Sequence, residues 1–390
     1  MAPFSGRLFN SRSGGGAGPP GPAGPAGPAG PPGSPAPGIT FSDHGVPLAG
    51  GPVTSIDIEG IGGNAFATGP GAIQINVPPA AAPAFGFAYF SGGMVGGVAP
   101  AVNNTDRLTF ASDVVAMVSK GILNTAILGA AGFNSATFGY VAGGENNALA
   151  TVALIQRLNF ASDATGMVLP GSTLTSVRKN PSAANSTTFG YIAGGENGVP
   201  ADTSSCDGMA FASDNLICVA KGALTAVRTQ QAATNSNLAG YFSGGLQGAL
   251  AEANTSALIF ASDATAMVAK GVLGSATNFQ VAFNSTTFGY YTGGTTLGVP
   301  TVNTWRLDFS SDASAMVAKG ALSTVRTNAP GGANSTLAGY AAGGNTTGAL
   351  GFTNICDTLL FSTDAAAMLA VGSLTVPRDQ LAGYQSGGIL

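Results

Sequence analysis

Short segments of alternating apolar and polar residues run along most of the chain, and one kind of segment recurs about every fifty residues. Each recurring segment is rich in aromatic residues and ends in a Gly-Gly pair. Alternation with a period of two, bounded by Gly, Asn and Asp, is typical of β-strands, and no segment sustains a helical period over three turns. The pattern predicts an all-β fold. The first glycines of the pairs are Gly92, Gly143, Gly194, Gly244, Gly293, Gly343 and Gly387.

A common order of segments follows each Gly-Gly pair except the last. A variable loop comes first, then a strand with a phenylalanine, as in residues 106–113, and then a strand with a methionine that ends in glycine, as in residues 266–271. An aspartate stands three residues after each repeat phenylalanine. It suits a turn, because its carboxylate can accept hydrogen bonds from backbone amides just downstream. These residues are Asp113, Asp163, Asp214, Asp263, Asp312 and Asp364.

Other residue types also keep fixed places in the repeat. The methionines share their place with Cys218 and are expected to pack in the core. The asparagines precede the repeat tyrosine by six residues and are predicted to lie in turns. The lysines precede the repeat glycine at a rim, where they are either solubilising edge charges or a weak basic ring for an anionic glycan. Arginines also share one repeat position. The four sets are Met117, Met167, Met267, Met316 and Met368; Asn134, Asn185, Asn235, Asn284 and Asn334; Lys120, Lys221, Lys270 and Lys319; and Arg178, Arg228, Arg326 and Arg378.

The repeat period predicts a propeller, but its two kinds of strand occur in unequal numbers. There are seven segments that end in Gly-Gly and six with the phenylalanine and aspartate. Segments at residues 53–58, 64–71 and 72–77 could supply the missing strands. We therefore expect seven blades, with a composite blade in which the C-terminal strand pairs with N-terminal strands and protects open edges. A six-bladed ring with the last strand used elsewhere is the alternative.

Glycine takes every third place near the N-terminus, and proline is frequent between the glycines. This spacing is collagen-like, because only glycine fits at the axis of a triple helix. It predicts a trimeric stalk, with a polyproline linker in a monomer as the alternative. The expected organisation is an anchor at 1–17, the stalk at 18–38, a linker at 39–51 and the propeller at 52–390. The stalk glycines are Gly18, Gly21, Gly24, Gly27, Gly30 and Gly33.

The aromatic strand that ends in Gly-Gly, with a later arginine, resembles kelch-type β-propellers over about residues 52 to 390. The chain departs from the usual kelch pattern, since the repeat tryptophan is absent and the sole tryptophan is Trp305. More specifically, Gly-Tyr-x-x-Gly-Gly followed by Arg-Leu-x-Phe-x-Ser-Asp, downstream of a collagen-like run, resembles propeller proteins of tailed-phage virions. This resemblance implies a fibre or an appendage of the capsid or tail.

Composition and residue types exclude several kinds of site. Only 8% of residues are charged and the net charge is −4, so there is no basic stripe for nucleic acid. Three cysteines without a CxxC spacing argue against a disulfide framework and a zinc site. A single histidine, His44, argues against a copper site and a Ser-His-Asp triad. Because the repeat arginines and aspartates are spread over the blades, we predict no catalytic, metal or cofactor site.

The sequence also bears on location and partners. The uncharged stretch at 80–102 is rejected as a membrane span, since it contains prolines and glycines and repeats elsewhere beside charges. No secretory signal is recognised, so synthesis in the host cytoplasm is expected.

We expect a non-enzymatic virion protein, a homotrimer held to other virion proteins by residues 1 to 50. Its propeller would contact a host glycan or protein. A carbohydrate-binding propeller outside a virion is the alternative, although the loops after Gly-Gly carry no Trp or Tyr for stacking on a sugar. Variable loops on a rigid ring are where we expect binding. They lie at 94–104, 145–152, 196–205, 246–254, 295–303 and 345–354.

Overall fold

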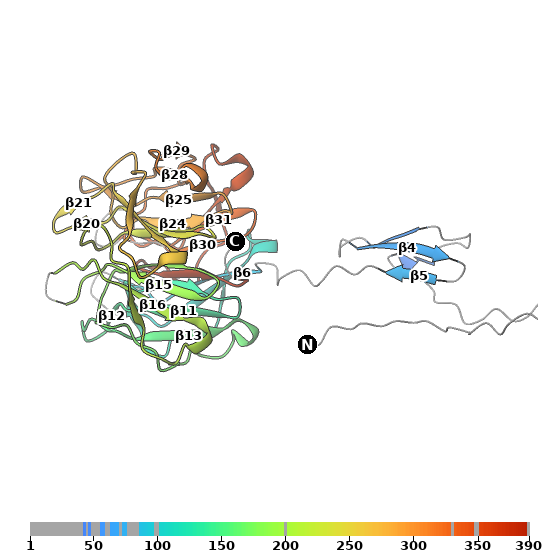
Figure 1. Cartoon of the computed structure of the whole chain (residues 1–390), viewed down its shortest axis with the longest axis horizontal. Coiled ribbons are helices and arrows are strands. Elements are labelled where there is room, and N and C mark those ends of the chain that lie inside the picture. The colour runs from blue at the N-terminus through green and yellow to red at the C-terminus, as the bar shows by residue number, and fades with distance from the viewer. Residues whose placement is uncertain are drawn as a thin grey trace, which may run out of the picture. The chain divides into compact units, whose positions relative to one another are not determined.

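The computed structural model describes residues 86–96, 101–198, 201–328, 331–346 and 351–387, and upstream of them the backbone of five strands. The chain divides into two compact units, Met1–Ala82 and Pro83–Leu390. In the first unit β1 (Ser42–Asp43) pairs with β2 (Val46–Pro47), and β3 (Ser55–Ile58), β4 (Gly63–Gly69) and β5 (Ala72–Ile75) form one antiparallel sheet (Figure 1). The predicted anchor and collagen-like stalk lie outside the described residues, as does most of the predicted linker.

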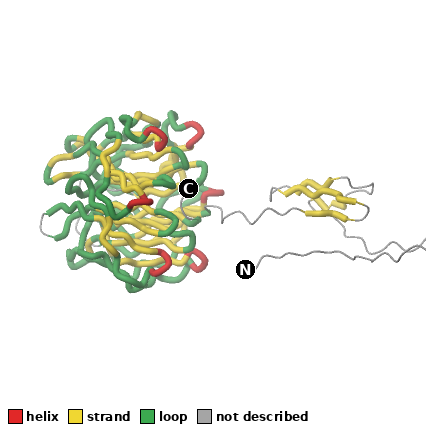
Figure 2. Tube along the Cα trace, in the orientation of Figure 1, coloured by secondary structure: helices red, strands yellow, loops and turns green. Residues whose placement is uncertain are grey.

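The described part of the second unit is a β-propeller of six antiparallel blades (Figures 1 and 2). Blade 1 contains β34 (Ala382–Gln385), β6 (Phe87–Ser91), β7 (Thr105–Thr109) and β8 (Val118–Ser119), from the inside outward; blade 2 contains β10 (Ala131–Asn134), β11 (Phe138–Ala142) and β13 (Ile155–Asn159). Blade 3 contains β14 (Ser182–Asn185), β15 (Phe189–Ala193), β16 (Cys206–Ala210) and β17 (Val219–Lys221); blade 4 contains β18 (Ala232–Asn235), β19 (Ala239–Ser243), β22 (Thr255–Ile259) and β23 (Val268–Lys270). Blade 5 contains β24 (Val281–Asn284), β25 (Phe288–Thr292), β28 (Thr304–Asp308) and β29 (Val317–Lys319); blade 6 contains β30 (Gly331–Asn334), β31 (Ala338–Ala342), β32 (Cys356–Leu360) and β33 (Leu369–Val371).

Smaller elements complete the ring. The repeat phenylalanines do not extend the third strands but begin one-turn 3-10 helices that follow them. These are Phe110–Ser112, Phe160–Ser162, Phe211–Ser213, Phe260–Ser262, Phe309–Ser311 and Phe361–Thr363. Two-stranded ladders stand beside the blades: β9 (Ile127–Leu128) with β12 (Glu145–Asn146), β20 (Leu246–Gln247) with β21 (Leu250–Ala251), and β26 (Thr295–Thr296) with β27 (Val299–Pro300).

The strands before Gly-Gly are the second strands of the blades and are buried on both faces. In β11 only Phe138 keeps partial exposure. In blades 2, 3 and 6 the glycine of the Gly-Tyr pair makes room for an aromatic ring of the preceding blade: a Cβ on Gly139 would lie 2.2 Å from the Tyr384 ring, and one on Gly190 would lie 2.3 Å from the Phe133 ring. In blades 4 and 5 the close neighbour is the side chain of Ala184 or Thr234. The recurrent Gly-Tyr pattern is therefore a requirement of packing between blades.

The repeat methionines lie in the hydrophobic clusters, as predicted. Met117, Met167 and Cys218 are all buried. The cluster around Met167, for example, joins Leu158 of blade 2 with Tyr89 and Tyr384 of blade 1. Each cluster of this kind fills the space between two neighbouring sheets, so the core is divided among the junctions of the ring.

The described chain has six blades, the alternative count, and the seven-bladed prediction is not confirmed. A composite blade does close the ring, but β34 pairs with β6, whereas the upstream strands β3, β4 and β5 pair with one another. Residues 382–388 resemble a second strand because they end in Gly-Gly. Their distance from Arg378, however, equals the distance of inner strand β18 from Arg228. The segment therefore takes an inner place, and the first described strand of the propeller along the chain is β6, which begins at Phe87.

The two chain ends of the propeller meet where other blades have a covalent hairpin. Ser386 N–H donates to the Phe87 carbonyl at 2.9 Å, and Phe87 N–H donates to Ser386 Oγ at 3.1 Å. Ser186 and Phe189 make the same two bonds within blade 3, at 2.8 and 3.0 Å. The ring is thus closed by the hydrogen bonds of a hairpin that lacks its connecting residues, and we call this closing blade, together with its junction to blade 6, the seam.

Candidate functional site

The repeat aspartates tie each blade to the one before it. Each follows a 3-10 helix, in a turn as predicted, but its carboxylate accepts hydrogen bonds from side chains of the neighbouring blade. Asp163 Oδ2 accepts from Tyr89 Oη at 2.9 Å and from Arg107 Nη1 at 2.7 Å, and Lys120 Nζ lies 3.1 Å from Oδ1. Tyr340 donates to Asp113 at 2.9 Å across the seam junction. The other pairs are Tyr140 with Asp214, Tyr191 with Asp263, Tyr241 with Asp312 and Tyr290 with Asp364.

The electrostatics of these clusters fit a structural role. Burial by itself would raise the pKa of Asp163, but hydrogen bonds from Lys120, Tyr89 and Arg107 outweigh it and hold that pKa below its usual range. Burial, together with the adjacent carboxylate, raises the pKa of Tyr89, so the phenol stays a donor. The Asp163 cluster is therefore an ion pair with a neutral tyrosine at physiological pH.

The repeat lysines take part in the same clusters, which corrects both of their predicted roles. Lys221 lies 2.7 Å from Asp263, Lys270 lies 2.8 Å from Asp312, and Lys319 lies 2.9 Å from Asp364. All are partly buried against the aspartate of the next blade. They neither form a basic ring for a glycan nor stand as free edge charges. Sequence reasoning missed these pairs because the partners lie in different repeats.

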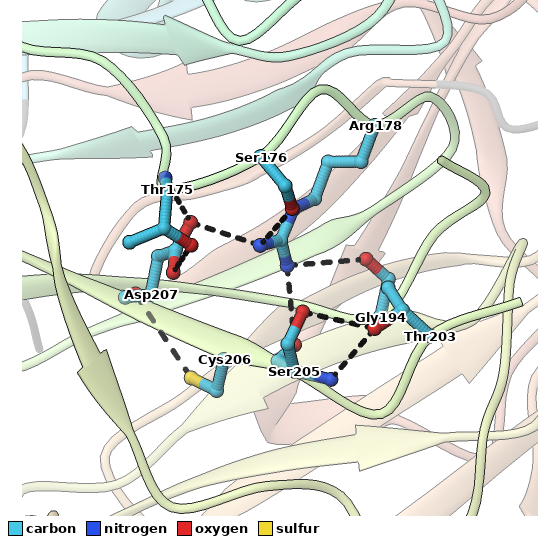
Figure 3. Close-up of polar contacts among 8 residues, drawn as sticks. All are labelled: Thr175, Ser176, Arg178, Gly194, Thr203, Ser205, Cys206 and Asp207. Carbon is cyan, nitrogen blue, oxygen red and sulfur yellow. Dashed lines mark hydrogen bonds and ion pairs between the residues drawn. The ribbon is translucent and has the colours of Figure 1, made fainter. Parts of the chain in front are cut away.

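The repeat arginines are buried inside the junctions rather than gathered in one site. Arg178 is 0% exposed, and its Nη2 donates to Asp207 Oδ2 at 2.9 Å (Figure 3). Its Nη1 donates to the backbone carbonyl of Ser205 at 3.1 Å. Thr175 donates to Asp207 with both its N–H, at 3.0 Å, and its hydroxyl, at 2.7 Å (Figure 3). Arg326 with Asp357 and Arg378 with Asp106 repeat this pair.

Arg228 is the exception among these arginines. Ser256 stands where the other three have an aspartate, and it accepts from Arg228 Nη2. Nη1 donates to the Asn254 carbonyl at 2.6 Å. No carboxylate of the described residues lies within ion-pair distance of this guanidinium. Burial therefore lowers the pKa of Arg228 to about 10.

A central cavity of about 130 Å³ runs between the inner strands of all six blades. At one level each inner strand ends in a carboxamide side chain that lines the cavity. The predicted turn asparagines therefore face the axis of the propeller, and the closing blade places a glutamine in the sixth position. We call these residues the amide ring: Asn134, Asn185, Asn235, Asn284, Asn334 and Gln385.

The variable loops lie at the opposite end of the blades from the hairpins that contain Ser186. In Figure 1 the loop strands β12, β20 and β21 lie at the left of the propeller, and the C-terminus lies at its right. Three of these loops present a leucine to solvent: Leu149 is 63% exposed, Leu250 72% and Leu297 89%. We call this end of the propeller the loop face.

The cysteines of the described chain are not activated thiols. Cys206, Cys218 and Cys356 are buried free thiols, and burial raises the pKa of Cys218 to about 12, so it stays protonated. The described residues contain no group of three or more His, Cys, Asp or Glu that could hold a metal ion. Over the same residues, no helix has the length and apolar character to cross a membrane.

The fold defines the class of protein as a six-bladed β-propeller. No known family model and no curated protein matches the chain.

Proposed function

We propose that this protein is a non-enzymatic structural protein of a bacteriophage virion, a trimeric fibre or an appendage of the capsid or tail that contacts the host surface. Two sequence features support this: the collagen-like run at 18–38 and the repeat that resembles propeller proteins of tailed-phage virions. In this proposal the N-terminal residues hold other virion proteins, and the propeller is the head that faces outward.

The ion pairs that most charged repeat residues form in the described part of the chain support a scaffold role. Asp163, Lys120 and Arg107 bind one another across a junction, and Arg178 binds Asp207. Groups engaged in this way hold blades together and are not available to activate a substrate. A rigid ring of this kind is suited to present loops to a partner.

We place the contact surface on the loop face because of its exposed leucines. Leu149 and Leu297 stand in the left-handed backbone region, with φ of +57° and +50°. A leucine is strained there, and its exposed side chain adds little to the core. Three exposed leucines on one face favour contact with an apolar patch of a protein over a sugar, for which stacking aromatics would be expected.

The test is binding of the full-length protein to intact host cells, together with competition against infection. A variant with Leu149→Ser, Leu250→Ser and Leu297→Ser is expected to bind at least about tenfold more weakly, as for loss of central apolar contacts. The matched control changes Leu238→Ser and Leu337→Ser, two leucines that are equally exposed but stand in hairpins at the other end of the blades. The control is expected to bind like the wild type.

Three results would contradict the proposal. Antibodies that fail to label purified particles would remove the virion assignment. A monomeric mass in solution would exclude the proposed trimer. Equal binding by the loop variant and its control would exclude the loop face as the contact surface. Separately, inhibition of binding by a free sugar would support the lectin alternative.

A further inference from the structure

The amide ring contains hydrogen-bond donors that the protein leaves unused. Asn185 Nδ2 and Asn334 Nδ2 are both buried, and neither has a partner among the described protein atoms. Both side chains line the central cavity. Buried polar groups are nearly always satisfied, so a donor without a partner at a cavity indicates that something else occupies the space.

The orientation of the Asn334 carboxamide follows from a bond between blades. Its Oδ1 accepts the backbone N–H of Asn284 at 3.3 Å across the junction of blades 5 and 6. The N–H can only donate, so this contact assigns the oxygen and leaves the NH₂ group without a protein acceptor. The unused group of Asn334 is thus a donor.

The charge of the cavity decides which ligand fits. None of the described residues that line it is Asp, Glu, Lys, Arg or His. A hard cation needs several oxygens at short distance, and the Asn334 oxygen already accepts from Asn284. An anion needs N–H donors and the absence of carboxylates, and this level offers the unpartnered NH₂ groups of Asn185 and Asn334 in a lining without carboxylates.

Other unpartnered atoms in the cavity lie at a different level. Gln231 Oε1 and both terminal atoms of Gln280 are buried without a protein partner. These glutamines directly precede inner strands β18 and β24, whereas the asparagines of the amide ring end those strands. They offer donors and acceptors together, which suits water. At the level of the ring, the buried atoms without a protein partner are the amide nitrogens of Asn185 and Asn334.

We propose that the amide ring binds one small monovalent anion through its side-chain N–H groups, with chloride as the abundant member of that class. The site lies on the axis of the propeller and draws a carboxamide from every blade, including Gln385 across the seam. An anion held there contacts all six blades at once. This inference is independent of the proposed function, because it concerns the interior of the ring and not the loop face.

Bromide is the probe for a direct test with the full-length protein. Crystals grown in sodium bromide are expected to show an anomalous peak on the propeller axis, within hydrogen-bond distance of the amide nitrogens. In solution, the thermal midpoint is expected to rise with bromide concentration at constant ionic strength, since a ligand of the folded state stabilises it by mass action. Density that fits only water, or no dependence of the midpoint on bromide, would overturn the proposal.

A pair of variants separates the site from general salt effects. Asn334→Asp keeps the oxygen that accepts from Asn284 and adds a negative charge beside the anion, so apparent bromide affinity is expected to fall at least about tenfold. Asn303→Asp adds the same charge at an exposed loop position and is expected to respond to bromide like the wild type. Equal responses of the two variants would contradict an anion in the ring. A rubidium peak at the ring would show a cation site instead.

Discussion

Two junctions of the ring each bury an arginine at the same repeat position, but only one of these arginines has a carboxylate partner. At the seam, Arg378 Nη1 donates to Asp106 Oδ2 at 2.9 Å, and its Nη2 donates to the Phe90 carbonyl at 3.0 Å. Between blades 3 and 4, Arg228 donates to a backbone carbonyl and to the Ser256 hydroxyl. Both guanidinium groups are 0% exposed.

The comparison separates two roles of this arginine. Its donation to backbone carbonyls is common to both junctions, so satisfying those carbonyls is the shared role. The aspartate adds neutralisation of a buried charge, which only the seam provides. The junction into blade 2 has Ile127 at the arginine position and Gln156 at the aspartate position, so both members of the pair are replaced there. The Arg228 junction retains one member without the other.

Removal of the arginine tests this difference with the largest expected effect. Arg378→Met strands Asp106 in the core, and loss of one partner of a buried pair lowers the free energy of unfolding by about 3–5 kcal/mol. Arg228→Met strands no charge, so its expected loss is about 1–3 kcal/mol, from carbonyls left without a donor. Urea unfolding of both variants measures the two values.

Equal losses at the two positions would contradict the interpretation, since they would mean that the carboxylate adds nothing. A change in the urea dependence itself would show that opening of the seam has altered the folded state. The Arg228 variant serves as the control for loss of side-chain volume, because the two arginines are equally buried.

A second difference between the two junctions is the residue after the arginine. At the seam it is Asp379, and between blades 3 and 4 it is Thr229. Asp379 is 0% exposed, and its Oδ2 accepts from Asn328 Nδ2 at 3.0 Å, while Oδ1 has no partner among the described atoms. Burial raises the pKa of Asp379 to about 6, against which the bonds from Asn328 and Asn345 act only in part.

The raised pKa of Asp379 makes the seam less stable as the pH rises. A folded pKa above the unfolded value near 3.9 means that folding favours the protonated acid, so its contribution is greatest below about pH 4 and is lost through pH 6. Asp379→Asn is expected to raise the free energy of unfolding at pH 7 by about 3 kcal/mol relative to wild type and to have little effect at pH 4. Thr229→Val is the control. A variant that is equally stabilised at both pH values would contradict the titration of this group.

The sequence predicts the features that belong to one repeat, but not the contacts between residues of different repeats. The all-β fold and the propeller follow from strand patterns that recur in each copy. A composite closing blade follows from the unequal numbers of the two strand types, although its N-terminal partner is β6 and not the expected residues 53–77. The places of Asp163 and Lys120 within their repeats were also predicted. Their pairing was not, because the two residues belong to different copies and only the packed ring brings them together.

The blade count and the amide ring show the same limit. Residues 382–388 look like a second strand by composition, and only their spacing from Arg378 indicates an inner one. The fixed place of Asn185 in the repeat was clear, but periodicity cannot tell whether a residue lies in a turn or faces an axis. One sequence signal was available: three of the four copies that have the arginine also have the aspartate, and the two copies that lack the arginine lack the aspartate too.

The smallest expected effect is a gain in the free energy of unfolding. It is expected when the Arg228 junction receives the arginine–aspartate pair that the seam has. Ser256→Asp places a carboxylate where Asp106 stands in blade 1, against a guanidinium that is already buried. Since the arginine is desolvated in either case, the added pair is expected to increase the free energy of unfolding by about 1–2 kcal/mol at pH 7. The new carboxylate would have a lowered pKa in the folded state, so the gain is present above about pH 4 and is lost as the pH falls through the folded pKa.

The control for this variant is Ser256→Asn, which has the same size without the charge and is expected to be neutral or destabilising. Urea unfolding at pH 7 and pH 3 measures both. If aspartate and asparagine behave alike, the Arg228 junction is limited by space and not by charge, and the seam owes its strength to the hydrogen bonds of Thr375 and the Phe90 carbonyl rather than to neutralisation.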